Sequence, residues 1–288
     1  MIKQLIRLAR PQQWVKNGIL LISLVFSGEL SNLGKVEISI FATAIFCLLS
    51  SSAYTINDMV DKEKDRQHPI KKNRPLASGQ VTNSQASVMV ILLWMVSIIG
   101  AWFVNLNFFI VSLVFIGFNI IYSVWLKNIV ILDVMSLAIS FVIRAYAGAL
   151  AIDVVASKWL IINTLLLALF LGFGKRRHEL ILLEEGATAH RKILDKYSPY
   201  LLDQMIGVTT ASVVVMYMLY SFSPEVMNKL GTGNLFMTIP FVVYGIFRYL
   251  YLIHKEEQGG SPTKVLITDK PIMVTVILWV LTSIIILY

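Results

Sequence analysis

The chain has 288 residues, of which 57% are hydrophobic and only 15% are charged, and its formal net charge at pH 7 is +8. Soluble domains carry about 25% charged residues, so this composition excludes an ordinary soluble protein and predicts an integral membrane protein. The single cysteine, Cys47, excludes a disulfide within one chain.

The chain begins with "MIKQLIRLARPQQWVKN", in which charged residues interrupt every apolar run. No small-residue cleavage site follows, so the pattern does not fit a signal peptide. It predicts an amphipathic interfacial helix that leads into the first membrane span. Lys16 and Arg10 flank Trp14, and two interpretations stay open for them: contact with a lipid phosphate, or an anchor at the membrane interface.

A membrane-spanning helix needs about 20 mostly apolar residues. This criterion predicts an all-α, polytopic membrane protein with a single transmembrane domain over 1–288. Nine stretches qualify: 14–33, 36–57, 86–104, 107–126, 130–152, 158–174, 200–222, 235–253 and 271–288.

Basic residues are distributed unevenly between the two sides of these nine spans. On one side lie 21 Lys and Arg residues and on the other side three. The positive-inside rule then predicts a cytoplasmic N-terminus and an outside C-terminus. The net positive charge is accounted for by this topology and by anionic lipids, and it implies no nucleic-acid partner.

The stretch 57–79, "NDMVDKEKDRQHPIKKNRPLASG", follows the second predicted span and concentrates both signs of charge. Asn57, Asp61 and Asp65 are spaced so that a helix would place them on one face, and Asp58 can converge on the same point. Clustered carboxylates require a cation, and oxygen-only ligands favour Mg²⁺, with Mn²⁺ as an alternative. We therefore expect Asp58, Asp61 and Asp65 to be catalytic metal ligands.

The basic part of this stretch predicts a phosphate-binding loop next to the metal. Arginine binds phosphate through two parallel hydrogen bonds and lysine as a point charge. The competing interpretation is a salt-bridged juxtamembrane helix, and the one-face spacing of the acids favours the metal site. The expected substrate contacts here are Asn57, Arg66, His68, Lys71 and Arg74.

This stretch resembles the first aspartate-rich motif of the UbiA superfamily of intramembrane prenyltransferases, commonly N-D-x-x-D-x-x-x-D followed by R-P. The resemblance implies a helical barrel of nine spans that binds a diphosphate through Mg²⁺ at its cytoplasmic mouth. It also implies a multi-pass protein of the bacterial cytoplasmic membrane.

Three charged residues stand in or beside the fifth predicted span. Lys127 is either a phosphate ligand or an ordinary inner-loop charge, and Asp133 could orient Lys127 or contact ribose hydroxyls. Arg144 lies within the span, where a charge usually faces a cavity or a partner. Arg144 could bind a phosphate or bridge helices. The sequence favours the structural role slightly.

The loop after the sixth predicted span departs from the superfamily pattern. Most members carry a second acidic motif, D-x-x-x-D, at this point, whereas this chain has "GKRRHELILLEEGATAHRKILDK". A basic cluster in place of an acidic one predicts direct binding of an additional phosphate. We expect Lys175, Arg176 and Arg191 to bind it, and Arg177 and Lys192 to be solvated loop charges.

Further segments are similar to one branch of the superfamily, the decaprenyl-phosphate phosphoribosyltransferases. They are "RPQQWVKN", "YSVWLKNIVILDV", "FVIRAYAGA" and "FRYLYLIHKEEQGGSP". The resemblance implies transfer of 5-phosphoribose from phosphoribosyl pyrophosphate (PRPP) to a polyprenyl phosphate for a cell-envelope polysaccharide precursor. It adds Tyr122 and Lys16 to the expected substrate contacts.

Two other functions compete with this one. A prenyltransferase that alkylates an aromatic acceptor would require the second acidic motif after the sixth span. A divalent-cation-dependent transporter would require charges near the bilayer midplane, where only Arg144 qualifies. A homo-oligomer is compatible with the sequence.

Overall fold

The computed structural model describes residues 1–68, 71–184, 193–256 and 260–288. All regular structure in these residues is helical, as predicted. The elements are α1 Ile2–Ala9, η1 Pro11–Ile19, α2 Leu20–Phe26, α3 Leu33–Val60, α4 Lys62–Gln67, η2 Lys71–Asn73, α5 Asn83–Val104, α6 Leu106–Val124, η3 Leu126–Asn128, α7 Leu132–Ala151, α8 Lys158–Glu184, η4 Leu194–Lys196, α9 Pro199–Ser221, α10 Pro224–Leu230, η5 Asn234–Thr238, α11 Ile239–His254, α12 Pro262–Thr268 and α13 Lys270–Leu287.

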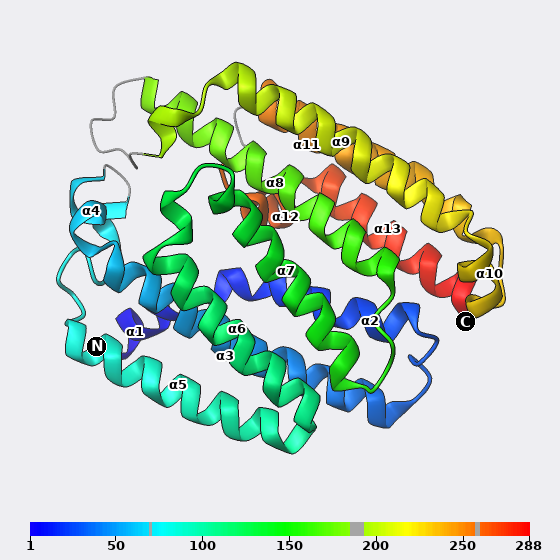
Figure 1. Ribbon diagram of the computed structural model, residues 1–288, viewed down its shortest axis with the longest axis horizontal. Helices are drawn as coiled ribbons and strands as arrows, with labels where there is room; N and C mark the ends of the chain where they lie inside the picture. The colour runs from blue at the N-terminus through cyan, green and yellow to red at the C-terminus, as the bar shows by residue number, and fades with distance from the viewer. Residues whose placement is uncertain (69–70, 185–192, 257–259) are drawn as a thin grey trace.

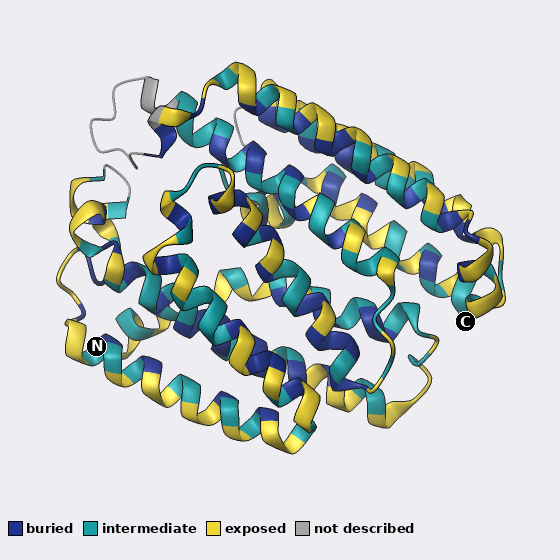
Figure 2. Cartoon of the chain, in the orientation of Figure 1, coloured by how far each residue is buried: buried dark blue, intermediate teal, exposed yellow. Residues whose placement is uncertain are grey.

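Within the described residues, eight helices are long and apolar enough to cross a membrane. They are α3, α5, α6 extended through η3, α7, α8, α9, α11 with η5, and α13. Their outer faces expose large apolar side chains: Ile91, Leu92, Met95 and Ile99 on α5 are each about half exposed. Figure 2 shows the same pattern along α5. Such surfaces are stable in lipid, where helices satisfy their own backbone groups.

The first predicted span, 14–33, is not one continuous helix. Residues 11–19 form the 3-10 helix η1, and the α-helix that follows, α2, has only seven residues. Asn17 is fully buried here, and its side chain accepts hydrogen bonds from Arg144 and Ser50. This polar segment therefore lies against α3 and α7 instead of continuing as a regular span.

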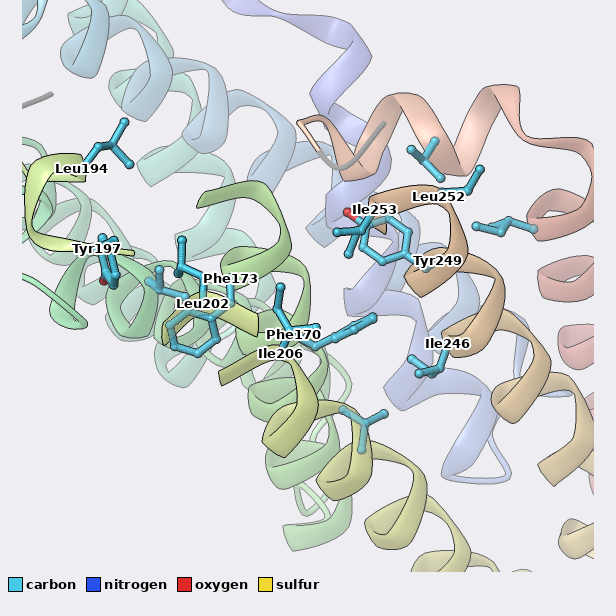
Figure 3. Close-up of a cluster of buried hydrophobic side chains, with 14 of the residues drawn as sticks. Phe170, Phe173, Leu194, Tyr197, Leu202, Ile206, Ile246, Tyr249, Leu252 and Ile253 are labelled. Atoms are coloured by element: carbon cyan, nitrogen blue, oxygen red, sulfur yellow. The ribbon is translucent and has the colours of Figure 1, made fainter. Parts of the chain in front are cut away.

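The long helices form two groups on either side of α7 (Figure 1). One group contains α3, α5 and α6, and its core is built on Phe46, Phe108 and Phe115. The other contains α8, α9, α11 and α13, with a core around Phe170 and Tyr249 (Figure 3). Helix α7 is rich in Ala, Ser and Gly on its buried positions, which lets both groups approach its backbone closely.

The two ends of the bundle differ in charge. Helix α4, the end of α8 and the start of α9 lie at one end, and α10 and the C-terminus lie at the other (Figure 1). Asp61, Asp65 and Arg74 all belong to the first of these ends. The aspartate-rich part of the predicted substrate site thus lies at one end of the bundle.

Candidate active site

Asp58 and Asp65 face a common point at the end of α3. The carboxylates are 2% and 6% exposed, and one nitrogen of Arg74, Nη1, donates to Asp58 Oδ1 at 2.9 Å and to Asp65 Oδ2 at 2.6 Å. Arg10 Nη2 donates to both oxygens of Asp58, at 2.5 and 2.7 Å. Two buried carboxylates are therefore held by two arginines whose side chains are about one quarter exposed.

The backbone keeps the helical spacing of the acids although α3 ends at Val60. The Asp61 N–H donates to the Asn57 carbonyl at 3.0 Å, and the Asp65 N–H donates to the Asp61 carbonyl at 2.8 Å, which carries the chain from α3 into α4. The i, i+4 relation predicted from the sequence thus holds across the helix junction.

Asp61 has a different cation. Lys127, on η3, places its Nζ 2.8 Å from Asp61 Oδ1 and 3.0 Å from Asn57 Oδ1. The lysine side chain is only 3% exposed, so this ammonium is part of the interior of the site. Asn57, Asp61 and Lys127 were each predicted as site residues, and the fold joins them over 70 positions of sequence.

The donor set suits a hard divalent cation. No group of three His, Cys, Asp or Glu side chains within the described residues is close enough to hold a metal ion by itself. Mg²⁺, however, is commonly bound by one or two carboxylates together with substrate phosphates. Asp58 and Asp65 already converge on a single cationic atom of Arg74, so these two carboxylates fit the group, whereas Asp61 faces Lys127.

Burial raises the pKa of the Asp65 carboxyl above its usual range, and the Arg74 guanidinium opposes that rise. Desolvation disfavours the charged form, and a neighbouring cation restores it. The carboxylate therefore depends on a positive partner, whether a guanidinium or a metal ion.

A second ionic cluster joins α7 and α8. Arg176 Nε donates to Asp133 Oδ2 at 2.5 Å, and its Nη1 donates to Glu179 Oε2 at 2.5 Å. The Tyr197 hydroxyl donates to Asp133 Oδ1 at 2.8 Å and accepts from the Ile131 N–H. Burial raises the pKa of Tyr197, so this phenol stays protonated as a donor.

Asp133 and Arg176 are completely buried in this cluster. The predicted role of Arg176 as a phosphate ligand stays untested, but its guanidinium already neutralises two carboxylates. Tyr122 lies near enough to affect Arg176 electrostatically. This arrangement occupies the region where the second acidic motif of the superfamily would stand.

The other predicted contacts are distributed around these two clusters. Arg66 pairs with Glu63 and donates to the Ala77 carbonyl, away from the aspartates. His68 ends α4 and accepts from the Lys71 N–H at 3.3 Å. Lys175 lies 4.0 Å from Glu179. Arg191 and Lys192 lie outside the described residues, and Arg177 pairs with Asp203.

A large apolar cavity of about 610 Å³ is lined by residues of η1, α2, α8, α9, α11 and α13. Lys16 lines it, and the Lys16 ammonium also lies 5.9 Å from the centre of the Tyr54 ring. Arg10 lies over the same ring at 5.4 Å. Lys16 therefore stands between the cavity and the arginine that holds Asp58.

Arg144 has the structural role that the sequence slightly favoured. Its guanidinium donates to Asn17 Oδ1 at 3.0 Å and to both oxygens of Ser140, and it lies 4.8 Å from the centre of the Phe115 ring. It thereby ties η1 and α6 to α7. No contact joins it to the aspartates among the interactions of the described residues.

Two residues of these clusters did not stand out in the sequence. The sequence suggested for Arg10 a contact with a lipid phosphate or an anchor at the membrane interface, yet it holds Asp58 from 48 positions away. Tyr197 carried no pattern at all, because its contact with Asp133 is created by the packing of the chain before α9. The one signal in the sequence that could have indicated Arg10 is its position next to the end of a predicted span.

The fold and the site together define a class: a multi-pass helical membrane protein whose buried carboxylates and basic side chains meet at one mouth of the bundle. The chain belongs to the UbiA prenyltransferase family, whose model matches residues 20–267.

Relatives and solved structures agree with this assignment. The chain is 32% identical to the decaprenyl-phosphate phosphoribosyltransferase of Mycolicibacterium smegmatis, over 97% of this chain and 91% of that one. It is 30% identical to the protein of the same name from Mycobacterium tuberculosis, over 98% and 93%. The predicted resemblance to the superfamily and to this branch is thereby confirmed.

The same fold occurs in a UbiA homolog from Archaeoglobus fulgidus bound to GPP and Mg²⁺. That structure matches with a TM-score of 0.71 at 17% identity, over 99% of both chains. A form of that homolog bound to DMAPP and Mg²⁺ matches equally well. These likenesses confirm the predicted UbiA-like fold.

Proposed function

We propose that this protein transfers 5-phosphoribose from PRPP to a polyprenyl phosphate and releases pyrophosphate. The observation that carries the proposal is the similarity over nearly the whole chain to proteins named decaprenyl-phosphate phosphoribosyltransferase. The sequence after the sixth predicted span supports it, because Lys175, Arg176 and Arg177 stand in place of a second acidic motif, and PRPP carries a separate 5-phosphate in addition to its diphosphate.

The donor diphosphate would lie at the mouth formed by α3, α4 and η3. Asp58 and Asp65 would hold Mg²⁺, which supplies charge neutralisation to the departing pyrophosphate when it is bound. Asp61 and Lys127 form the adjacent wall. The phosphates would be held by basic side chains at this end of the bundle. They are Arg74, Lys71 and those around Lys175.

The chemistry needs no strong base. A phosphate oxygen of the acceptor forms a bond to C1 of the ribose while the bond from C1 to the pyrophosphate oxygen breaks, and the electron pair leaves with pyrophosphate. The acceptor phosphate is already an anion. The task of the protein is to position the two reactants and to exclude water.

The lipid acceptor would enter from the apolar cavity. Lys16 lines the cavity and lies over the same Tyr54 ring as Arg10, which holds Asp58. Burial lowers the pKa of the Lys16 ammonium to about 7, and a phosphate beside it would favour its charged form. The apolar lining suits an isoprenoid chain. In this assignment the single domain over 1–288 sits in a bacterial cytoplasmic membrane. The charged mouth faces the cytoplasm and the C-terminus lies outside, in agreement with the distribution of Lys and Arg.

The direct test is an assay of the purified chain with radiolabelled PRPP, polyprenyl phosphate and Mg²⁺. We expect a labelled lipid, and we expect Asp65→Asn to abolish it. Asp203→Asn is the matched control, because Asp203 pairs with Arg177 and contacts none of the aspartate-cluster residues among the described residues, and it should retain activity. Absence of labelled lipid, together with labelling of 4-hydroxybenzoate from a prenyl diphosphate, would instead support an aromatic prenyltransferase.

A further inference from the structure

Arg74 and a divalent cation require the same place in this site. Arg74 Nη1 lies within hydrogen-bond distance of Asp58 and Asp65 at once, at 2.9 and 2.6 Å. A metal bound by both carboxylates would sit about 2.0–2.1 Å from their oxygens. That position overlaps the position of Nη1, so both cations cannot contact the two carboxylates together.

The carboxylates also cannot be left without a cation. The side chains of Asp58 and Asp65 are 2% and 6% exposed, and an unpaired buried charge is strongly unfavourable. A metal ion that enters must therefore replace one positive charge with another. Arg74 is suited to this exchange because its side chain is 26% exposed and belongs to the loop between η2 and α5, so it can move without disturbing a helix.

We infer that Arg74 is an exchangeable counter-cation: it neutralises Asp58 and Asp65 until a metal–diphosphate complex arrives, and it then transfers to the phosphate oxygens. This inference rests on the proposed function only in requiring that the site binds a metal together with a diphosphate. Arg10 stays on Asp58 throughout, because it contacts that carboxylate through both oxygens and does not touch Asp65.

The exchange couples the two ligands. A metal ion alone must displace a guanidinium that then has no anion to bind, so its affinity is lowered. A metal that arrives with a diphosphate supplies that anion, and a guanidinium binds phosphate through two strong hydrogen bonds. Arg74 is thus a positioning residue that disfavours the metal alone and favours the metal–diphosphate complex.

The test measures Mn²⁺ binding to the detergent-solubilised full chain from the electron paramagnetic resonance signal of free Mn²⁺, with and without inorganic pyrophosphate. For Arg74→Gln we expect Mn²⁺ alone to bind roughly fivefold or more tightly than to the wild type, as loss of a competing ion pair implies. With pyrophosphate present, we expect binding to the variant to be weaker than to the wild type.

The opposite signs separate the inference from a purely structural role, which would weaken both affinities. Arg74→Lys keeps a cation. Both of its Mn²⁺ affinities should therefore differ less from those of the wild type than the affinities of Arg74→Gln do. Lys62→Gln removes an equal charge from α4, where Lys62 contacts Asn83 instead of the aspartates, and should leave both affinities unchanged.

The inference would be overturned if Arg74→Gln bound Mn²⁺ alone no more tightly than the wild type. It would also be overturned if Lys62→Gln changed the Mn²⁺ affinities as much as Arg74→Gln does. If Arg74→Gln does not fold, Arg74→Lys serves instead: its primary ammonium cannot contact the phosphate in a bidentate way, so only the pyrophosphate-dependent affinity should fall. Failure of the proposed function would be distinguishable, because it removes the lipid product and leaves these affinities intact.

Discussion

At the scale of single residues, three buried aspartates of this protein are each compensated by a cation from another element. Asp58 on α3 is held by Arg10 between α1 and η1, Asp61 by Lys127 on η3, and Asp133 on α7 by Arg176 on α8. Each pair is largely or wholly shielded from solvent on its acidic side. Such pairs add little net stability, but removal of one partner leaves an uncompensated charge.

Asp133 is the most deeply buried of these three aspartates, and its side chain is fully shielded from solvent. Replacing it by asparagine in Asp133→Asn leaves the fully buried Arg176 with Glu179 as its remaining acidic contact. We expect the free energy of unfolding to fall by about 3 kcal/mol. Thermal unfolding in detergent micelles measures this change.

Asp203→Asn is the control for that measurement. Its partner Arg177 is only partly buried and Asp203 itself is 38% exposed, so its effect should stay within about 1 kcal/mol. An effect of Asp133→Asn no larger than that of the control would contradict the role of Asp133 in joining α7 to α8.

The sequence supported the acidic cluster better than its partners. The spacing of Asn57, Asp61 and Asp65 is local, and a helix translates it directly into geometry. The pairing of Asp58 with Arg10, or of Asp133 with Tyr197, depends on which helices become neighbours. No local pattern encodes that, so these contacts could not be predicted from one sequence.

At the scale of elements, α2 and α7 approach each other unusually closely. A Cβ atom added to Gly148 on α7 would collide with the backbone of Leu20. Ser23 on α2 donates to the Ala145 carbonyl one turn away. The absence of a side chain at Gly148 is what allows this short helix to lie against α7.

Gly148→Ala should therefore be destabilising, by about 1–3 kcal/mol, because the backbone of α2 must shift to make room. Gly117→Ala is the matched control on α6, where an added Cβ meets nothing within 4 Å. That control should be neutral or stabilising by about 0.5–1 kcal/mol. Thermal unfolding of both variants checks the contrast, which would be absent if α2 were loosely held.

The start of α13 provides a pH-dependent contact. Asp269 caps this helix by accepting from the Ile272 N–H, and Arg248 on α11 donates to its carboxylate at 2.9 Å. The Arg248 hydrogen bond lowers the pKa of Asp269 below its usual value. A lowered folded-state pKa contributes stability above the unfolded value, and that stability is lost as the pH falls through the folded value.

The comparison of wild type with Asp269→Asn tests this contact. Asparagine keeps a capping oxygen but loses the ion pair with Arg248. We expect the wild type to melt at a higher temperature at pH 7, and the difference to shrink as the pH falls below about 4. A difference that is independent of pH would show that the ion pair is not its source.

Eight of the nine predicted spans correspond to helices of span length in the described residues. The stretch 14–33 differs because hydropathy is an average over a window of residues. It contains no information that Asn17 and Lys16 contact neighbouring helices. Asn17 is buried and hydrogen-bonded to Arg144 and Ser50. Its polarity marks a contact within the protein, not a lipid-facing turn.

At the scale of the whole molecule, the apolar cavity extends from Lys16 to an aromatic wall formed by Phe26, Trp159, Tyr217, Tyr220 and Trp279. Trp159 lies about 25 Å along α8 from Arg176, at 1.5 Å per residue. A volume of about 610 Å³ is in the range of small-ligand pockets. For the proposed acceptor, a cavity of this volume would hold several isoprene units and not a long chain in full.

The wall should therefore contact long acceptors and not short ones. Tyr220 stands in it against Phe26, Trp159 and Tyr217. For Tyr220→Ala we expect kcat/KM to fall roughly tenfold with a ten-unit polyprenyl phosphate, because apolar contact is lost. With a two-unit acceptor it should be unchanged, and so should the KM for the donor.

Trp102→Ala controls for loss of an aromatic side chain, since Trp102 is 60% exposed on α5 and does not line the cavity. It should affect neither acceptor. An equal fall for both acceptor lengths in Tyr220→Ala would mean that the wall supports the fold without contacting the lipid. A fall restricted to the long acceptor would place the isoprenoid chain in the cavity, with its phosphate at the Lys16 end and its later units against the wall.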